Sequence, residues 1–215
     1  MARLIKLLIL LACLLIPAST GAWMSPIICG GGVEEEVGGE AEITDDYSSD
    51  TSSDYTGISG GISISGGNAG GSSNWAENTA YHETALSDPD HYAQAEIQQL
   101  ASSQSSAVLA RCNGTTYYAA VLNGTYIKLF KSDLSGSSSA DYNGGYASDG
   151  TYYTVKMEVS GTGATVNVKV YVDETLRIDY DDSTSPYTAG DYCGVGFRRD
   201  SGGNPRLDDL ECSAL

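Results

Sequence analysis

Short segments in which apolar and polar residues alternate one by one constrain the fold of this chain most. In the clearest, residues 166–172, four valines alternate with Asn167, Lys169 and Tyr171. A period of two places successive side chains on opposite faces of a β-strand, so the valines are expected to face a core. Clusters of Gly, Ser, Asn and Asp separate these segments, and no apolar spacing typical of a long helix occurs. The pattern predicts an all-β sandwich of two antiparallel sheets.

The first 22 residues have the composition of a secretory signal. Two basic residues precede an apolar run at 7–16, and small residues follow at 18–22. The run is about half as long as a membrane-spanning helix, which needs about 20 residues. We expect residues 1–22 to be a cleaved signal peptide and the mature protein to be secreted or held at the cell surface. An uncleaved anchor and a lipoprotein attached through Cys13 are the alternatives.

Residues 23–43 form a Gly- and Glu-rich stretch without sustained periodicity. This composition predicts a flexible linker between the export signal and the folded part. The alternating segments beyond it predict one jelly-roll domain at 44–215. The linker has a second interpretation, in which it is an arm exchanged between subunits and drives self-assembly.

The chain is strongly acidic, with 28 Asp and Glu residues against 11 Lys and Arg and a net charge of −17. The excess grows when Arg3 and Lys6 leave with the signal peptide. A surface of this charge repels phosphate backbones, so we expect no nucleic-acid partner. Anionic membrane surfaces are disfavoured for the same reason, whereas binding of divalent cations is favoured.

Four cysteines follow the predicted signal peptide: Cys29, Cys112, Cys193 and Cys212. An even number in an exported chain indicates disulfides, and four cysteines allow three full pairings. If the strands flanking residues 201–204 form a symmetric hairpin, Cys193 lies opposite Cys212, at a distance that a disulfide tolerates. Cys112, which alternation places on the core side of its strand with Val108 and Ala110, competes for either partner.

Six segments of the alternating region follow one another in a characteristic order. They are Ile43–Asp50, Trp75, Ser87–Ile97, the pair Val108–Cys112 and Tyr117–Val121, Tyr171–Phe197, and Arg206–Glu211. In this order they resemble the concanavalin A-like (laminin-G-like) jelly-roll domains of secreted bacterial and phage-associated proteins. The resemblance covers about residues 44–213 and implies a fold that lectins, carbohydrate-binding modules, adhesive domains and glucanases share. It implies a fold more than an activity, so function has to be argued from side chains.

A catalytic carboxylate set is missing from the sequence. Glucanases of this fold carry two Glu and one Asp at alternate positions of a strand, where the carboxyl groups share a face. The same-face neighbours of Glu96 are Gln94 and Gln98, which cannot serve as proton donors. The Gly57–Gly61 segment matches a nucleophile elbow, but the helix that this motif requires does not follow. We therefore expect no enzymatic activity, and a glycoside hydrolase is the least favoured interpretation.

The aromatic composition favours sugar binding. The chain has 15 Tyr and 2 Trp but only 2 Phe, which suits rings placed at a surface, because Tyr keeps a polar tip for water. Sugars are held by aromatic faces and by planar polar groups. The expected ligand-binding residues are Gln94, Glu96, Gln98, Arg111, Tyr117, Tyr118 and Trp75. The first four, with Tyr117 or Tyr118, are expected on one outward face that the middle strands share. The alternative is a hydrated face on which tyrosines fill strand positions because of their β-propensity.

Acidic residues gather near both ends of the predicted domain, at Asp45 and Asp46 and at Asp208 and Asp209. First and last strands often lie side by side in this fold, so these oxygen ligands are predicted to share a calcium ion. Acidic solubilising turns are the alternative.

Two functional hypotheses follow. The first is an exported, non-catalytic carbohydrate-binding or adhesive domain whose partner is an extracellular glycan. The second is a structural or assembly subunit of a surface layer, filament or virion, joined through the N-terminal arm.

Overall fold

The computed structural model describes residues 41–73, 76–99, 103–147, 149–198 and 205–215. All of them belong to a compact unit, Gly39–Leu215. The predicted signal peptide, nearly all of the predicted linker, Cys29 and Trp75 lie outside the described residues. Within the described ranges no helix is long and apolar enough to cross a membrane.

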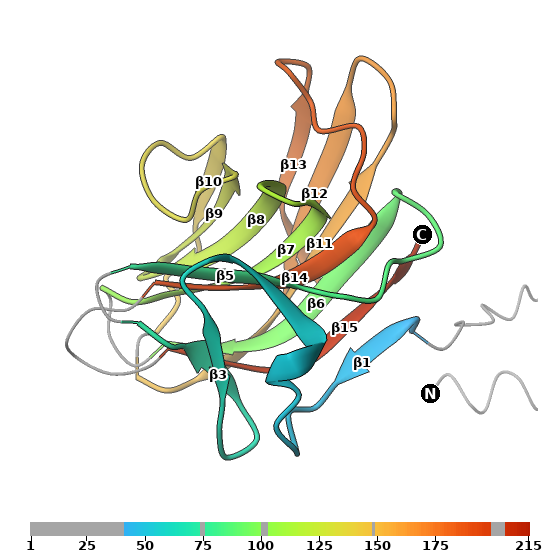
Figure 1. The fold of residues 1–215 in the computed structure, drawn as a ribbon. Helices are drawn as coiled ribbons and strands as arrows, with labels where there is room; N and C mark the ends of the chain where they lie inside the picture. Colours follow the sequence, from blue (N-terminus) through green and yellow to red (C-terminus); the bar gives the residue numbers. More distant parts are fainter. Residues whose placement is uncertain (1–40, 74–75, 100–102, 148, 199–204) are drawn as a thin grey trace, which may run out of the picture. The chain divides into compact units, whose positions relative to one another are not determined.

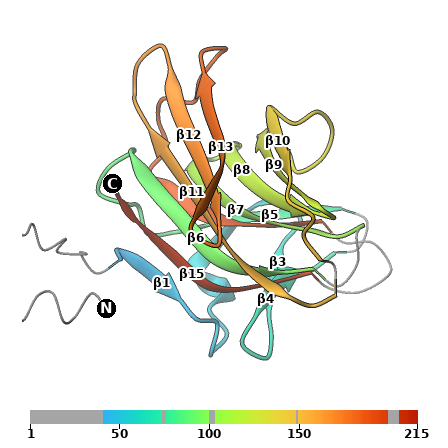
Figure 2. The same ribbon diagram turned by 180° about the vertical axis from the view of Figure 1, so that it is seen from behind.

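The strands pair antiparallel in two sheets (Figures 1 and 2). The eight-stranded sheet has the order β13 (Thr175–Asp182), β12 (Val166–Val172), β11 (Tyr152–Ser160), β6 (His91–Gln98), β15 (Arg206–Ala214), β4 (Ala69–Gly71), β3 (Ile62–Ile64), and β1 (Ile43–Asp45) also pairs with β15. The seven-stranded sheet has the order β10 (Ala140–Asn143), β9 (Tyr126–Lys131), β8 (Thr116–Asn123), β7 (Ser105–Asn113), β14 (Tyr192–Arg198), β5 (Glu77–His82), β2 (Tyr55–Ser59). The single 3₁₀ turn among the described residues is η1 (Ser52–Asp54). The predicted two-sheet antiparallel jelly-roll sandwich is confirmed.

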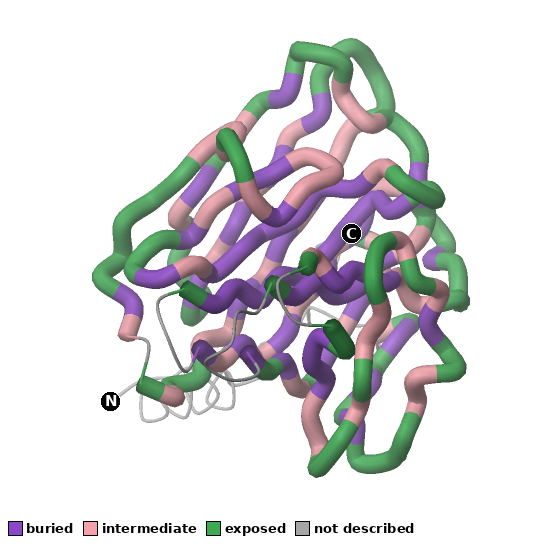
Figure 3. Tube along the Cα trace, turned by 60° about the vertical axis from the view of Figure 1, so that its left-hand side comes forward, coloured by how far each residue is buried: buried purple, intermediate pink, exposed green. Residues whose placement is uncertain are grey.

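The core between the sheets is formed by alternate side chains, as the period-two pattern predicted. The four valines of β12 are fully buried, whereas Asn167, Lys169 and Tyr171 are half-buried on the other face. Figure 3 shows the same alternation of buried and less buried positions along the strands. Most of the large buried apolar side chains, from both sheets, form one cluster, which supplies most of the hydrophobic stabilisation.

The first and last strands lie side by side, as predicted. Ile43 of β1 pairs with Cys212 of β15, and Asp45 pairs with Leu210. The predicted central hairpin is also present, because β7 and β8 pair with Val108 opposite Ala120.

A β-bulge in β7 reverses the predicted orientation of Cys112. Arg111 has a φ of 53°, and the pairing with β8 shifts between Ala110 and Asn113. One extra residue in a strand exchanges the faces of the residues that follow. Cys112 therefore leaves the side of Val108 and Ala110 and is buried, unpaired, in a smaller cluster on the outer face of the seven-stranded sheet.

The structure contains the Cys193–Cys212 disulfide, but the hairpin from which it was inferred is wrong. Cys193 lies on β14, which pairs with β7 and β5, and Cys212 lies on β15, which pairs with β6 and β1. β14 and β15 are consecutive but belong to opposite sheets, so the bridge crosses the core.

Candidate functional site

An open pocket of about 670 Å³ lies where β6, β15 and β1 meet, next to η1. Six of its lining side chains are acidic: Asp45, Asp46, Asp54, Glu96, Asp209 and Glu211. A smaller pocket of about 290 Å³, lined in part by Lys156, Glu158 and Tyr171, continues across β11 and β12. Because both pockets are lined by Gln94 and Thr154, they form one depression, here called the polar groove.

A bulge in β15 shapes the deeper part of the polar groove. Asp208 pairs with Glu96 and Glu211 pairs with Gln94, so β15 has more residues than β6 over this stretch. Asp209, with a φ of 49°, and Leu210 together lie opposite the single residue Ala95. A bulge bends the strand and re-aims side chains, and here it brings Asp209 and Leu210 into the pocket wall.

Two tyrosine rings are fixed beside the groove floor. The Tyr92 hydroxyl donates a hydrogen bond to Glu211, and the Lys156 ammonium lies 4.4 Å from the centroid of the Tyr92 ring. Burial and the Glu211 carboxylate raise the pKa of Tyr92, so this hydroxyl keeps its proton and remains a donor. Tyr171 donates to Glu158 at 3.1 Å, and Glu158 pairs with Lys156 at 2.9 Å.

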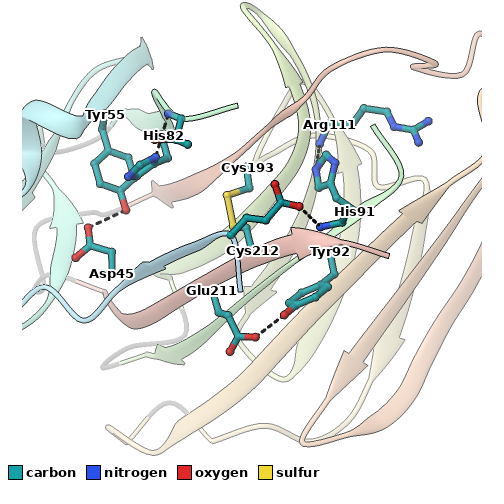
Figure 4. Close-up of a disulfide and its surroundings, with 12 residues drawn as sticks. Asp45, Tyr55, His82, His91, Tyr92, Arg111, Cys193, Glu211 and Cys212 are labelled. Atoms are coloured by element: carbon teal, nitrogen blue, oxygen red, sulfur yellow. Dashed lines mark hydrogen bonds between the residues drawn. A yellow bond between two sulfur atoms is a disulfide. The ribbon is translucent and has the colours of Figure 1, made fainter. Parts of the chain in front are cut away.

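Asp45 holds the β1–η1 corner of the groove together. Its carboxylate accepts hydrogen bonds from the Tyr47 amide at 2.9 Å, the Thr51 hydroxyl at 2.6 Å and the Tyr55 hydroxyl at 3.1 Å. Figure 4 shows the contact with Tyr55. Because both carboxylate oxygens are engaged internally, Asp45 mainly stabilises this corner.

The four acids predicted to share calcium are close to one another. Burial raises the pKa of Asp208, and the negative charges of Asp209, Asp46 and Asp45 add to this effect. In the described part of the chain, however, no three acidic, His or Cys side chains are arranged to hold a metal ion. With both oxygens of Asp45 engaged, the four carboxylates do not form a ready calcium site.

Of the predicted ligand-binding residues, Gln94 and Glu96 line the polar groove. Gln98 shares their face of β6, but its amide donates to the Gly150 carbonyl at 2.6 Å, and it is not among the groove-lining residues. Trp75 lies outside the described residues, so its role stays a prediction.

Arg111 is not on a binding surface. Its side chain is fully buried, and its guanidinium donates to the carbonyls of Pro89, Gly161 and Tyr187 and pairs with Asp90 at 2.7 Å. The bulge at Arg111 turns the side chain inward, where strict alternation predicted an outward position.

Tyr117 and Tyr118 are also separated from the groove. Tyr118 points into the core and donates to Asp182 at 2.7 Å, whereas Tyr117 is buried on the outer face of the seven-stranded sheet. The prediction that β6, β7 and β8 share one outward face was wrong. β6 belongs to one sheet, and β7 and β8 belong to the other.

Sequence reasoning missed several groove residues, including Thr154, His82 and Asp54. Thr154 enters the groove because β11 pairs with β6 and places it opposite Glu96. A long-range register of this kind leaves no local pattern in the sequence. Asp209 of β15 was singled out in the sequence, but as a calcium ligand rather than as a residue that lines the groove.

Comparisons with known proteins support the fold. No family model matches the sequence, and no curated protein matches it either. Among solved structures, the carbohydrate-binding module CBM66 from Bacillus subtilis is similar, with a TM-score of 0.60, 17% identity, and coverage of 75% of this chain and 96% of that one. The potassium-bound carbohydrate recognition domain of Emp46p has a TM-score of 0.55 at 9% identity, covering 81% and 94%. An endo-1,3-beta-glucanase from Streptomyces sioyaensis has a TM-score of 0.55 at 10% identity, covering 82% and 97%.

These similarities show a jelly-roll sandwich of the concanavalin A-like type, as the sequence resemblance implied. Identities this low carry the fold and no site residues. The neighbours include binding domains and an enzyme, so the function of this chain has to rest on its own groove.

Proposed function

We propose that this chain is an exported, non-catalytic domain that binds an extracellular glycan in the polar groove. The observation that supports this most is the composition of the groove floor. It places the Gln94 amide, the Glu96 carboxylate and the Thr154 hydroxyl side by side, with Tyr92 and Tyr171 next to them.

This set suits a sugar for two physical reasons. Planar amide and carboxylate groups accept or donate two parallel hydrogen bonds and therefore bridge neighbouring hydroxyls. Tyrosine rings offer apolar faces to the C–H surface of a pyranose, and here the hydroxyls of Tyr92 and Tyr171 hold the rings in place by donating to Glu211 and Glu158. An open groove on a sheet surface also admits a segment of a longer sugar chain.

The non-catalytic part of the proposal rests on how the acids are distributed. β6 contributes one groove acid, Glu96, and β15 contributes two, Asp209 and Glu211, at its bulge. The three alternating carboxylates that glucanases of this fold carry on one strand are therefore not reproduced on either strand.

Binding to an array of neutral and charged glycans, with and without calcium, tests the proposal. Gln94→Ala is expected to weaken binding of any captured neutral glycan by about tenfold, since a bidentate amide contact contributes about 1–2 kcal/mol. Asn167→Ala is the matched control, because Asn167 is an amide on the same face of the same sheet, outside the groove lining.

Loss of binding in both variants, or in neither, contradicts the assignment of the groove. Capture of no glycan at all, together with a large assembly in size-exclusion chromatography, would favour the subunit hypothesis instead. Calcium binding at Asp45, Asp46, Asp208 and Asp209 stays a prediction, and the calcium-free arm of the array tests it.

A further inference from the structure

The deeper part of the polar groove gathers acidic side chains from segments that are far apart in the sequence. Its six acids come from β1, the turn that follows it, η1, β6 and β15. None of the described residues that line this part is Lys or Arg. Charges of one sign in a hollow add to one another, so the fold concentrates negative potential at this place.

The six acids differ in how far they are engaged inside the protein. The Asp45 carboxylate accepts from its three internal donors, and Glu211 accepts from the Tyr92 hydroxyl (Figure 4). Within the described part of the chain, the carboxylates of Glu96 and Asp209 take part in no hydrogen bond or ion pair. Glu96 is half-buried and Asp209 is exposed, so a ligand in the groove can reach both.

Strand pairing brings the two unengaged acids next to a neutral hydroxyl. Glu96 lies opposite Thr154 of β11 on one side and opposite Asp208 of β15 on the other. Side chains that lie directly opposite on one face have Cβ atoms about 4.5–5.5 Å apart. Asp209 follows Asp208 at the bulge and, like Glu96 and Thr154, lines the groove. This part of the groove floor is therefore a cluster of oxygen acceptors.

The negative potential also affects a neighbouring carboxyl group. Burial raises the pKa of Asp208, and the charges of Asp209, Asp46 and Asp45 add to this effect. The same charges that oppose ionisation of a further acid stabilise a positive charge placed beside them.

An ammonium group suits this floor better than a sugar hydroxyl does. It has three N–H donors and no acceptor, so carboxylate oxygens and a hydroxyl oxygen can satisfy all three. A hydrogen bond between charged groups is also about twice as strong as one between neutral groups. Gln94 can both donate and accept, so it suits the hydroxyl groups of the same sugar.

We propose that the polar groove selects a cationic glycan, a polysaccharide of hexosamine units whose amino groups are not acetylated. This inference rests on the proposed function and names the ligand class of the same groove. The sugar amine binds to Glu96 and Asp209 next to the Thr154 hydroxyl, and the ring hydroxyls bind to Gln94.

Paired oligosaccharides test this inference, because acetylation removes the charge of the amine and leaves the sugar ring unchanged. Hexamers of glucosamine and of galactosamine are titrated calorimetrically with the full chain at pH 6, each beside its fully N-acetylated counterpart. EDTA in every titration excludes bridging by calcium. One opposite-charge contact at about 4 Å in water raises the affinity about fivefold. With two such contacts, at least one free-amine hexamer is expected to bind about tenfold or more tightly than its acetylated counterpart.

Three variants locate the effect. Glu96→Gln combined with Asp209→Asn keeps the shape of the floor and removes both charges, so the ratio of the two affinities should fall to near one. Asp50→Asn, at an exposed acid outside the groove lining, should keep the wild-type ratio. Gln94→Ala should weaken binding of both hexamers of a pair and keep their ratio.

Two outcomes overturn the inference and leave the proposed function intact. One is binding of a neutral glycan that depends on Gln94 but shows no preference for free amines. The other is a preference for free amines that persists when Glu96→Gln and Asp209→Asn are combined. A lysine hexapeptide that binds more tightly than either free-amine hexamer also overturns the inference, because the groove would then recognise charge without sugar. If no glycan binds, cationic or neutral, both the inference and the proposed function fail.

Discussion

Cys193 and Cys212 are joined across the core by a disulfide whose Cα atoms lie 6.6 Å apart, one on each sheet. Both sulfur atoms are fully buried among the residues of the main hydrophobic cluster (Figure 4). β15 also pairs with β1, so the bridge fastens the strands at both ends of the domain to the opposite layer.

We predict that Cys193→Ala combined with Cys212→Ala lowers the free energy of unfolding by about 3 kcal/mol, because a closed loop of this size restricts the unfolded chain to about that extent. Urea titration measures the change. Reduction of the wild-type protein should reproduce it, and Cys112→Ala, which keeps the bridge, should lose the same amount on reduction. A reduced protein as stable as the oxidised one would contradict the prediction.

Arg111 anchors the loops at one end of the sandwich, so its removal is expected to affect stability rather than binding. Arg111→Met leaves carbonyl oxygens of Pro89, Gly161 and Tyr187 without their donor. Losing a buried, multiply bonded charge costs about 3 kcal/mol, which corresponds to a fall in Tm of roughly 10 °C. Arg206→Met, at an exposed position, is the control and should change Tm little. If Arg111→Met leaves Tm unchanged and weakens glycan binding, Arg111 is a ligand-binding residue after all.

The faces of individual strands could be predicted from the sequence because alternation is a local property. The inward positions of the four valines of β12 were assigned correctly. The bulge at Arg111 could not be predicted, since a non-glycine residue in the left-handed region has no mark in the sequence. Its consequence was large, because it exchanged the orientations of Arg111 and Cys112.

The assignment of strands to sheets was equally inaccessible. Nothing local distinguishes a hairpin from a crossover, so β6 and β7 were expected to share a face, and β14 and β15 to form a hairpin. The disulfide was nevertheless paired correctly, because Cys193 and Cys212 both face the core from their own sheets. A small part of the groove was found for a similar reason. Gln94 and Glu96 lie on one strand, whereas Thr154 and Asp209 join them only through long-range register.

His91 predicts a defined dependence of stability on pH. It is fully buried, and its Nε2 atom accepts a hydrogen bond from the Arg111 amide at 2.9 Å. Burial and the nearby Arg111 charge lower its pKa to about 4 from a usual value of 6.5. Between these two values the unfolded chain binds a proton that the folded protein does not, so stability is lost as the pH falls from 6.5 toward 4.

We expect wild type to lose about 3 kcal/mol over this window relative to His91→Gln, in which the amide oxygen can accept from Arg111 but does not titrate. Urea titrations of both proteins at pH 4, 5, 6 and 7 measure the difference. Parallel pH profiles would mean that His91 titrates normally in the folded state. His82→Gln is the matched control, because His82 is half-exposed.

The charge of the polar groove predicts which glycans it rejects. Six carboxylates line its deeper part, and Lys156 is the cation at its shallower end. At about 4 Å in water, each like-charge contact costs on the order of 1 kcal/mol. A sulfated or uronic acid-containing oligosaccharide is therefore expected to bind more weakly than its neutral counterpart. Salt at 0.5 M should reduce this difference in affinity by screening.

Asp46→Asn combined with Asp209→Asn, at two exposed groove positions, should raise the affinity for the anionic oligosaccharide several-fold and leave the affinity for the neutral one nearly unchanged. Asp50→Asn, an exposed acid outside the groove lining, should change neither affinity. Calorimetric titration with the two oligosaccharides measures these differences, and preferential binding of the anionic glycan by the wild-type chain would show that its ligand does not occupy this groove.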